Sequence, residues 1–198
     1  MATLKRIDVQ DGILSVGACT TLSRLLSFFS AGACRSEAMV NLLKRFGSKQ
    51  IRNRATIGGN LCSASPIGDL IPALLVLEAT AVLTRANGSR ILDLEEFIEG
   101  YRKTALAKDE YLSKISLSIP ESWSSFAFRK LSKRYEDDIS SVSIAVFLLH
   151  DNVRINEIRI ALGGAGDRAL RLFEVEKIIL FDLIFSLYFS LNPLTKFK

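Results

Sequence analysis

Three stretches of this chain have the pattern of β-hairpins. Residues 4–18 alternate apolar and polar side chains around Asp11 and Gly12, and such alternation around an Asp-Gly pair is typical of two antiparallel strands joined by a tight turn. Residues 80–94 repeat the pattern around Asn87 and Gly88. A third hairpin joins residues 141–150 to residues 153–164, and single strands are expected at 110–119 and 124–132. The sequence therefore predicts antiparallel sheets.

Short helices are expected between these strands. Residues 22–31 have amphipathic spacing behind Thr21, a good N-cap residue. A second helix covers 37–46 and ends at Gly47, because glycine readily takes the left-handed conformation that closes a helix. Further helices are expected at 70–79 and 94–99. The fold class is α+β, and we expect three parts divided near Pro120: 1–119, 120–171 and 172–198.

Composition limits the class of protein. The chain has 198 residues, of which 48% are hydrophobic and 24% charged, as in ordinary globular proteins, and this excludes a disordered or extended repeat protein. The net charge of +5 comes partly from two basic clusters, within residues 44–54 and 129–134. Neither cluster has the interleaved aromatic residues of a single-strand nucleic-acid platform. We expect solvated faces, or attraction of an anionic cofactor or partner, and no nucleic-acid binding.

Cysteine and histidine usage excludes several kinds of catalytic site. Cys19, Cys34 and Cys62 are odd in number and widely spaced, as expected for reduced thiols in a cytoplasmic protein, and no Cys-x-x-Cys pair indicates an iron–sulfur or zinc site in this chain. His150 is the only histidine and is expected in the turn of the third hairpin, so a histidine-based triad is not expected. We predict no catalytic side chain and no metal site. The N-terminus does not have the pattern of a signal peptide.

Residues 52–75, RNRATIGGNLCSASPIGDLIPALL, place small polar groups ahead of an apolar helix. We expect a loop here, in which Gly58 and Gly59 let the backbone approach a ligand and point amide groups at it. Asp69 has the carboxylate to accept hydrogen bonds from ribose or ribityl hydroxyls. Neutral hydrogen-bonding side chains surround the glycines: Thr56, Asn60, Ser63 and Ser65. The alternative is that the glycines only turn the chain and that Asp69 caps the next helix.

Four ordered motifs together carry a family resemblance. They are TIGGNLCSASPIGDLIPALLVLEA at 56–79, FIEGYRKTAL at 97–106, FRKLSKRYEDDIS at 128–140 and IRIALGGAG at 158–166. The chain resembles the FAD-binding module of the xanthine dehydrogenase family, among the molybdenum hydroxylases that include carbon monoxide dehydrogenase. The resemblance implies an FAD-binding subdomain of the PCMH type, followed by an incomplete C-terminal α+β subdomain of the carbon monoxide dehydrogenase flavoprotein type.

The function that the resemblance implies is electron transfer. This chain would hold FAD and pass electrons from iron–sulfur clusters to NAD or to oxygen. The molybdenum cofactor and the 2Fe-2S clusters are expected on partner chains or domains of a xanthine dehydrogenase-like complex. The implied cofactor-binding residues are Phe46, Thr56, Ile57, Gly58, Gly59, Asn60, Ser65, Asp69, Leu112 and Lys130.

Individual roles follow from the same resemblance. Phe46 would lie beside the flavin, Thr56 and Asn60 would hydrogen-bond the cofactor, and Asp69 would bind its sugar hydroxyls. Leu112 would pack on the cofactor and Lys130 would stand near the isoalloxazine ring. Without the family, ordinary core packing for Phe46 and Leu112 and a solvated strand face for Lys130 are the simpler interpretations.

Both ends depart from the family pattern. Family members begin several dozen residues earlier, with a Gly-rich loop for the FAD pyrophosphate, so the chain is expected to be truncated there and again at its C-terminal end. Residues 172–198 are rich in phenylalanine, and the apolar run 178–191 is shorter than the roughly 20 residues that span a bilayer. We therefore interpret the tail as a buried helix, a partner-binding helix, or a segment whose sequence has drifted or been altered from that of its ancestor. Two alternatives remain: a scaffold or relic that binds no FAD, and a membrane-surface or oligomerising protein.

Overall fold

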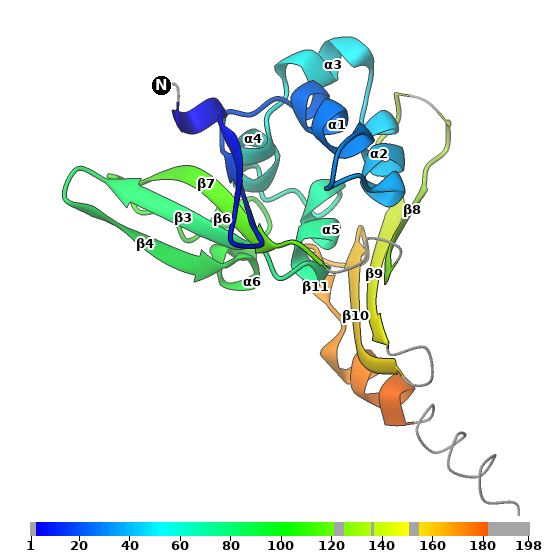
Figure 1. Cartoon of the computed structure of the whole chain (residues 1–198). Helices are drawn as coiled ribbons and strands as arrows, with labels where there is room; N and C mark the ends of the chain where they lie inside the picture. The colour runs from blue at the N-terminus through cyan, green and yellow to red at the C-terminus, as the bar shows by residue number, and fades with distance from the viewer. Residues whose placement is uncertain (1–2, 121–124, 136, 151–154, 182–198) are drawn as a thin grey trace, which may run out of the picture.

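The structure is a computed structural model, and it describes residues 3–120, 125–135, 137–150 and 155–181. A five-stranded antiparallel sheet is formed in the order β1-β2-β7-β3-β4 (Figure 1). A short 3-10 helix, Thr3–Lys5, precedes it. The strands of the five-stranded sheet are β1 Ile7–Gln10, β2 Ile13–Gly17, β3 Thr80–Arg85, β4 Gly88–Asp93 and β7 Tyr111–Ser118.

The first two predicted hairpins are confirmed. Gln10 pairs with Ile13 across the turn, and Asp11 and Gly12 both have positive φ, 51° and 76°, as a tight two-residue hairpin turn requires. In the second hairpin Arg85 pairs with Gly88. The turn therefore lies at residues 86–87, one position earlier than predicted, and Gly88 opens the returning strand.

The helices also follow the sequence closely. The helix α1 spans Leu22–Ser30, and the Thr21 side chain accepts a hydrogen bond from Arg24 N, as a cap should. The helix α2 spans Glu37–Lys44 and ends shortly before Gly47, which has a φ of 52°. The remaining predicted helices are α5, Leu70–Val76, and α6, Leu94–Phe97. A small hairpin that the sequence did not indicate follows α6, with strands β5 Ile98–Gly100 and β6 Lys103–Thr104.

A second antiparallel sheet has the order β11-β10-β9-β8. Its strands are β8 Phe126–Leu131, β9 Val142–His150, β10 Ile155–Gly163 and β11 Leu170–Arg171. The strand predictions for this half of the chain are thus confirmed, apart from the short β11. His150 corrects one expectation, because it is the last residue of β9 and pairs with Ile155. The turn of this hairpin, 151–154, lies outside the described residues.

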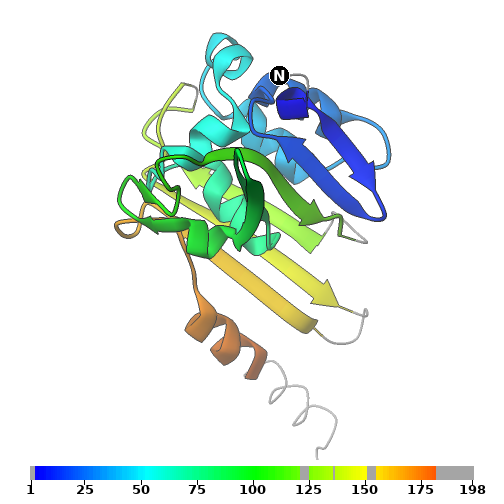
Figure 2. The same cartoon turned by 90° about the vertical axis from the view of Figure 1, so that its left-hand side faces the viewer.

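The helix α5 lies between the two sheets, as Figures 1 and 2 show. All seven of its residues are buried, which explains why residues 70–76 are almost wholly apolar. One hydrophobic core contains α5 together with Phe126, Phe128 and Phe147 of the second sheet. Residues before and after Pro120 therefore share a core, and the division near Pro120 stays a prediction.

The chain leaves the second sheet through β11 and continues as a helix over residues 173–181. This helix lies at the end of β10 that points away from α1, α2 and α3 (Figures 1 and 2). No helix in the described part of the chain is long and apolar enough to cross a membrane. The Phe-rich segment 182–198, for which the sequence left several interpretations open, lies outside the described residues.

Candidate functional site

The segment expected to be a glycine loop is helical, and this corrects the sequence interpretation. Two short helices occupy it, α3 Lys49–Arg54 and α4 Ile57–Cys62. Thr56 is the N-cap of α4, and its Oγ1 accepts a hydrogen bond of 3.0 Å from Gly59 N. The amide of Ile57 donates to Thr20 O at 3.1 Å, and that of Gly58 to Ala18 O at 2.9 Å. The backbone amides of residues 57–59 are therefore bonded within the protein, and the expectation that they point at a ligand is wrong.

Gly58 has a packing role within α4. A Cβ added to Gly58 would lie 2.7 Å from both the Cβ and the carbonyl oxygen of Ala18, too close for any side chain. Gly58 thus lets α4 lie against the backbone that follows β2. Gly59 is exposed, and its nearest contact for a Cβ is Thr56 Oγ1 at 3.1 Å.

A pocket of about 280 Å³ opens beside α4, and we refer to it as the site pocket. Five of the ten expected residues line it: Phe46, Asn60, Ser65, Asp69 and Lys130. They come from the turn after α2, from α4, from the loop between α4 and α5, and from β8. Its other lining residues are Gly47, Ile51, Ile67, Gly68, Asp137, Asp138 and Ile139. The fold thus brings together side chains from two of the four motifs, 56–79 and 128–140, and Phe46, which lies outside them.

A buried ion pair forms one wall of the site pocket. Lys130 Nζ lies 2.7 Å from Asp69 Oδ2, and the two side chains are only 3% and 7% exposed. Lys130 Nζ also donates to the carbonyl oxygens of Arg45, at 3.2 Å, and Asp138, at 2.8 Å. The Ser140 hydroxyl donates to the other carboxylate oxygen of Asp69. Because Asp69 makes no side-chain cap bond to α5, the alternative interpretation of Asp69 as a helix cap is wrong.

This pairing sets the electrostatics of the pocket. An ammonium group has three N–H donors, and all three on Lys130 have partners within the protein. Its charge is balanced by Asp69, so the pocket wall carries a neutral pair and not a free cation. The simpler interpretation of Lys130 as a solvated strand residue is also wrong, because the side chain points inward from β8.

The turn that carries Phe46 is held by an arginine from α3. Arg52 Nη1 donates to the carbonyl oxygens of Lys44, at 3.0 Å, and Phe46, at 3.3 Å, and also to Gly47 O. Phe46 is half-buried and packs partly against the core. The backbone of the turn that places the aromatic ring at the pocket edge is therefore held by Arg52.

Asn60 supplies the unsatisfied polar atom of the site. Its Oδ1 is buried and has no hydrogen-bond partner within the described structure. An unpaired buried acceptor is costly and fits a ligand that presents a donor, such as a ribityl hydroxyl or the imide N–H of a flavin. The pocket volume is at the lower limit for small-molecule sites, which are about 300–1,000 Å³. These residues therefore fit part of an FAD molecule.

The other five expected residues lie outside this lining. Thr56, Ile57, Gly58 and Gly59 belong to the start of α4, and Leu112 lies in β7, where it pairs with Leu83 and is 6% exposed in the core. Sequence reasoning also missed the partners of the ion pair. Asp138 and Ser140 were within a motif that carried the resemblance, but no local pattern assigns them to Lys130 and Asp69.

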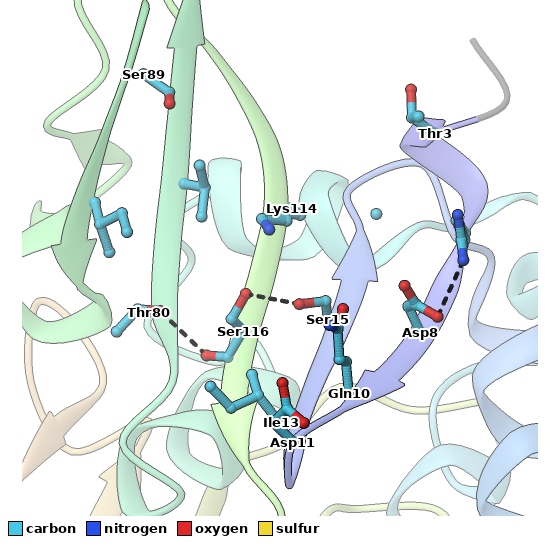
Figure 3. A pocket seen from close by; sticks show the side chains of 14 residues that line it. Thr3, Asp8, Gln10, Asp11, Ile13, Ser15, Thr80, Ser89, Lys114 and Ser116 are labelled. Atoms are coloured by element: carbon cyan, nitrogen blue, oxygen red, sulfur yellow. Dashed lines mark hydrogen bonds and ion pairs between the residues drawn. The ribbon is translucent and has the colours of Figure 1, made fainter.

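A larger hollow, about 700 Å³ in volume, lies on the open face of the five-stranded sheet (Figure 3). Short polar side chains cross its floor: Ser15 Oγ lies 3.2 Å from Ser116 Oγ, and Thr80 Oγ1 donates to Ser116 O at 3.3 Å. Lys114 projects from the central strand β7 (Figure 3). This hollow contains none of the ten expected residues, and the apolar side chains Ile13, Val82 and Ile91 line it beside the polar ones.

The helix α5 is buried between two antiparallel sheets, and the site pocket lies between the segment from α2 to α5 and the strand β8 of the second sheet. The chain belongs to the family described as the FAD binding domain in molybdopterin dehydrogenase, which matches residues 1–121. Residues 127–180 match the CO dehydrogenase flavoprotein C-terminal domain. The family and the fold class inferred from the four motifs are therefore confirmed.

Individual relatives agree with this assignment. The chain is 39% identical over 133 residues to a xanthine dehydrogenase of Blastobotrys adeninivorans, covering 65% of this chain and 9% of the relative. It is 35% identical over 143 residues to the nicotinate dehydrogenase FAD-subunit of Eubacterium barkeri, covering 70% of this chain and 48% of the relative. The carbon monoxide dehydrogenase structure from Hydrogenophaga pseudoflava superposes with a TM-score of 0.78 at 26% identity, covering 86% of this chain and 59% of that one. The chain thus spans less than two thirds of these relatives' length.

Proposed function

We propose that this chain binds FAD with its site pocket and acts as the electron-transfer module of a xanthine dehydrogenase-like oxidoreductase. Electrons would arrive from iron–sulfur clusters on partner chains, which would also hold the molybdenum cofactor, and would leave to NAD or oxygen. The observation that supports this most is the convergence of Phe46, Asn60, Ser65, Asp69 and Lys130 on one pocket in a chain of this family.

A separate FAD-carrying chain has precedent among the relatives. The Eubacterium barkeri protein is an FAD-subunit by name, and another relative is the medium chain of a glyceraldehyde dehydrogenase of Sulfolobus acidocaldarius. These names support the proposal that molybdenum and iron–sulfur groups of the complex lie on partner chains. A cytoplasmic location is part of the same proposal.

Bound FAD would supply the redox chemistry, since it exchanges electrons both singly and as hydride. The protein's residues would hold and orient it. Phe46 offers an aromatic face at the pocket edge, and Asn60 Oδ1 offers a buried acceptor. Ser65 adds a small hydroxyl from the loop between α4 and α5. The pair of Asp69 and Lys130 keeps this wall polar without net charge. Contacts of Thr56, Ile57, Gly58, Gly59 and Leu112 with FAD stay predictions.

FAD retention tests the proposal. The purified chain is mixed with FAD and passed through gel filtration, and flavin absorbance of the protein peak is measured. We expect flavin to elute with the protein and to decrease at least several-fold in Asn60→Ala, which loses the unpaired acceptor. Gln50→Ala is the matched control, because Gln50 is an exposed amide outside the pocket lining. Equal retention by the two variants would show that FAD is not held by this pocket.

A scaffold without FAD is the second candidate, and a specific observation favours it. The amides of Ile57, Gly58 and Gly59 are bonded internally, so the start of α4 offers a phosphate no free backbone donors. A correctly folded chain that retains no flavin, yet co-purifies with molybdenum and iron–sulfur partner chains, would establish the scaffold and contradict FAD binding.

A further inference from the structure

The two basic clusters of the sequence, within residues 44–54 and 129–134, meet in the fold. The helix α2 packs against β8 (Figure 1), and Arg45 Nη1 donates to Lys130 O, 85 positions away, at 2.8 Å. A pocket of about 270 Å³ opens there, and we call it the basic pocket. Its lining residues are Asn41, Lys44, Arg45, Phe128, Arg129, Lys130 and Tyr135. Cations from both clusters therefore surround one hollow.

The basic pocket has an excess of positive charge. None of its described lining residues is acidic, and Asp137 and Asp138, which follow β8, line the site pocket instead. Lys130 adds no net charge, because its ammonium group is in the buried ion pair. Lys44 and Arg129 are exposed, and neither forms an ion pair with any residue that the structure describes. Their charges are therefore available to an anion.

The end of α2 is prepared for an anion by its hydrogen bonds. The last carbonyl oxygens of a helix carry partial negative charge and would repel an anion. Here Lys44 O accepts from Arg52 Nη1 at 3.0 Å, and Arg45 O accepts from Lys130 Nζ at 3.2 Å. Within the described structure the Arg45 side chain uses two of its five N–H donors, on Lys130 O and Ser132 Oγ, and its buried Nε has no partner. This end of α2 thus offers an anion donors.

We propose that the basic pocket binds a phosphate group, either of inorganic phosphate or of a nucleotide. Guanidinium and ammonium groups bind phosphate oxygens through charge-assisted hydrogen bonds, and Lys44, Arg45 and Arg129 supply them from three sides of the chain's path. The volume is below that of sites for whole drug-sized ligands and suits one phosphate group.

Tyr135 gives the basic pocket a second possible contact. Its side chain is 76% exposed, and the Arg45 guanidinium lies 5.0 Å from the centre of its ring. An exposed aromatic ring beside cations offers a nucleotide base a surface for stacking. The ring therefore provides the feature that distinguishes a nucleotide from inorganic phosphate as the source of the phosphate group.

Thermal unfolding of the flavin-free full chain tests the proposal, because a ligand that binds the folded state raises the unfolding temperature. Inorganic phosphate is added in place of chloride at constant ionic strength. We expect it to raise the unfolding temperature of the parent, and Arg129→Gln and Lys44→Gln each to weaken phosphate binding at least several-fold. Lys133→Gln is the matched control, because Lys133 is an exposed cation of the same cluster outside the lining.

ADP, tested in the same way, separates the two sources of the phosphate group. Tighter binding of ADP than of inorganic phosphate, with the difference lost in Tyr135→Ala, would identify the ligand as a nucleotide. Equal binding of the two, unchanged in Tyr135→Ala, would identify it as inorganic phosphate. Either result supports a phosphate site in the basic pocket.

Three results would overturn the proposal. The first is a parent protein that phosphate stabilises no more than chloride does. The second is an equal loss in Lys133→Gln, which would show only diffuse attraction of anions, and the third is an equal loss in Asn60→Ala, which would place the phosphate in the site pocket. Asn60 lines only the site pocket, so this variant separates a failure of phosphate binding from a failure of FAD binding. Circular dichroism checks folding, and Lys44→Gln carries the test if Arg129→Gln does not fold.

Discussion

Lys130 and Asp69 are separated by 61 positions in the sequence and form a buried ion pair of 2.7 Å. The pair joins β8 of the second sheet to the residue before α5, and Arg45, Asp138 and Ser140 complete its hydrogen bonds. It therefore holds together three segments that surround the site pocket.

Removing one member of this pair should destabilise the fold strongly. We expect Asp69→Leu or Lys130→Met alone to lower the free energy of unfolding by about 3–5 kcal/mol, because each leaves a buried charge without its partner. The double variant removes both charges and should lose less than the sum of the two single losses. Urea unfolding of the parent, the two single variants and the double variant measures these losses. If the loss in the double variant equals the sum of the two single losses, the two side chains are not directly coupled.

Glu110 should make stability depend on pH in a defined range. Its carboxylate accepts two hydrogen bonds of 2.8 Å from Arg90 and one of 3.0 Å from Ala107 N, and chiefly the Arg90 bonds lower the pKa of Glu110 from 4.5 to about 2. A carboxyl group with a lower pKa in the folded state stabilises the fold above its unfolded pKa. That contribution is lost as the pH falls through the folded pKa.

The variant Glu110→Gln should therefore be less stable than the parent by a constant amount above about pH 5. The difference should shrink as the pH falls from 4.5 toward 2. Unfolding free energies measured across this range provide the test, with Glu99→Gln as the control because Glu99 makes an exposed ion pair with Lys103. A difference that does not change with pH would mean that Glu110 acts through packing alone.

Gly58 and Gly59 are neighbours in α4 and should respond oppositely to a methyl group. In Gly58→Ala the new Cβ meets Ala18 atoms at 2.7 Å, and relieving such overpacking costs about 1–3 kcal/mol. In Gly59→Ala the close atom is one side-chain hydroxyl at 3.1 Å, and alanine is favoured over glycine within a helix by up to about 1 kcal/mol. Thermal unfolding compares the stability of the two variants. An equal loss of stability in both would argue against the close packing of α4 at Gly58.

Arg45 should be needed for its planar guanidinium and not only for its charge. It donates to Lys130 O at 2.8 Å and to Ser132 Oγ at 3.1 Å, and it lies 5.0 Å from the Tyr135 ring. Lysine presents its donors from one point and cannot reproduce this fork. We expect Arg45→Lys to lower the unfolding free energy by about 1–2 kcal/mol. Arg54→Lys, at an exposed position, should have little effect, and a similar loss in both would refute the geometric role.

Sequence by itself determined the local elements of this protein. Alternation around Asp11-Gly12 predicts the first hairpin because a side-chain period of two and a turn that accepts positive φ are properties of neighbouring residues. The Thr21 cap of α1 and the apolar spacing of α1, α2 and α5 are equally local. Four short motifs also carried the family resemblance, because each can be recognised within a short stretch of neighbouring residues.

Tertiary structure alone decided how the site is built. The glycines at 58 and 59 predict a loop when they are considered with their neighbours, yet both lie in α4, where Gly58 packs against Ala18, forty positions away in the sequence. Lys130 and Asp69 each have simple local interpretations, a solvated strand residue and a helix cap, and the fold overrides both by bringing them together in a buried wall. Such pairings depend on how distant elements cross in space, and that information is not contained in any short stretch of sequence.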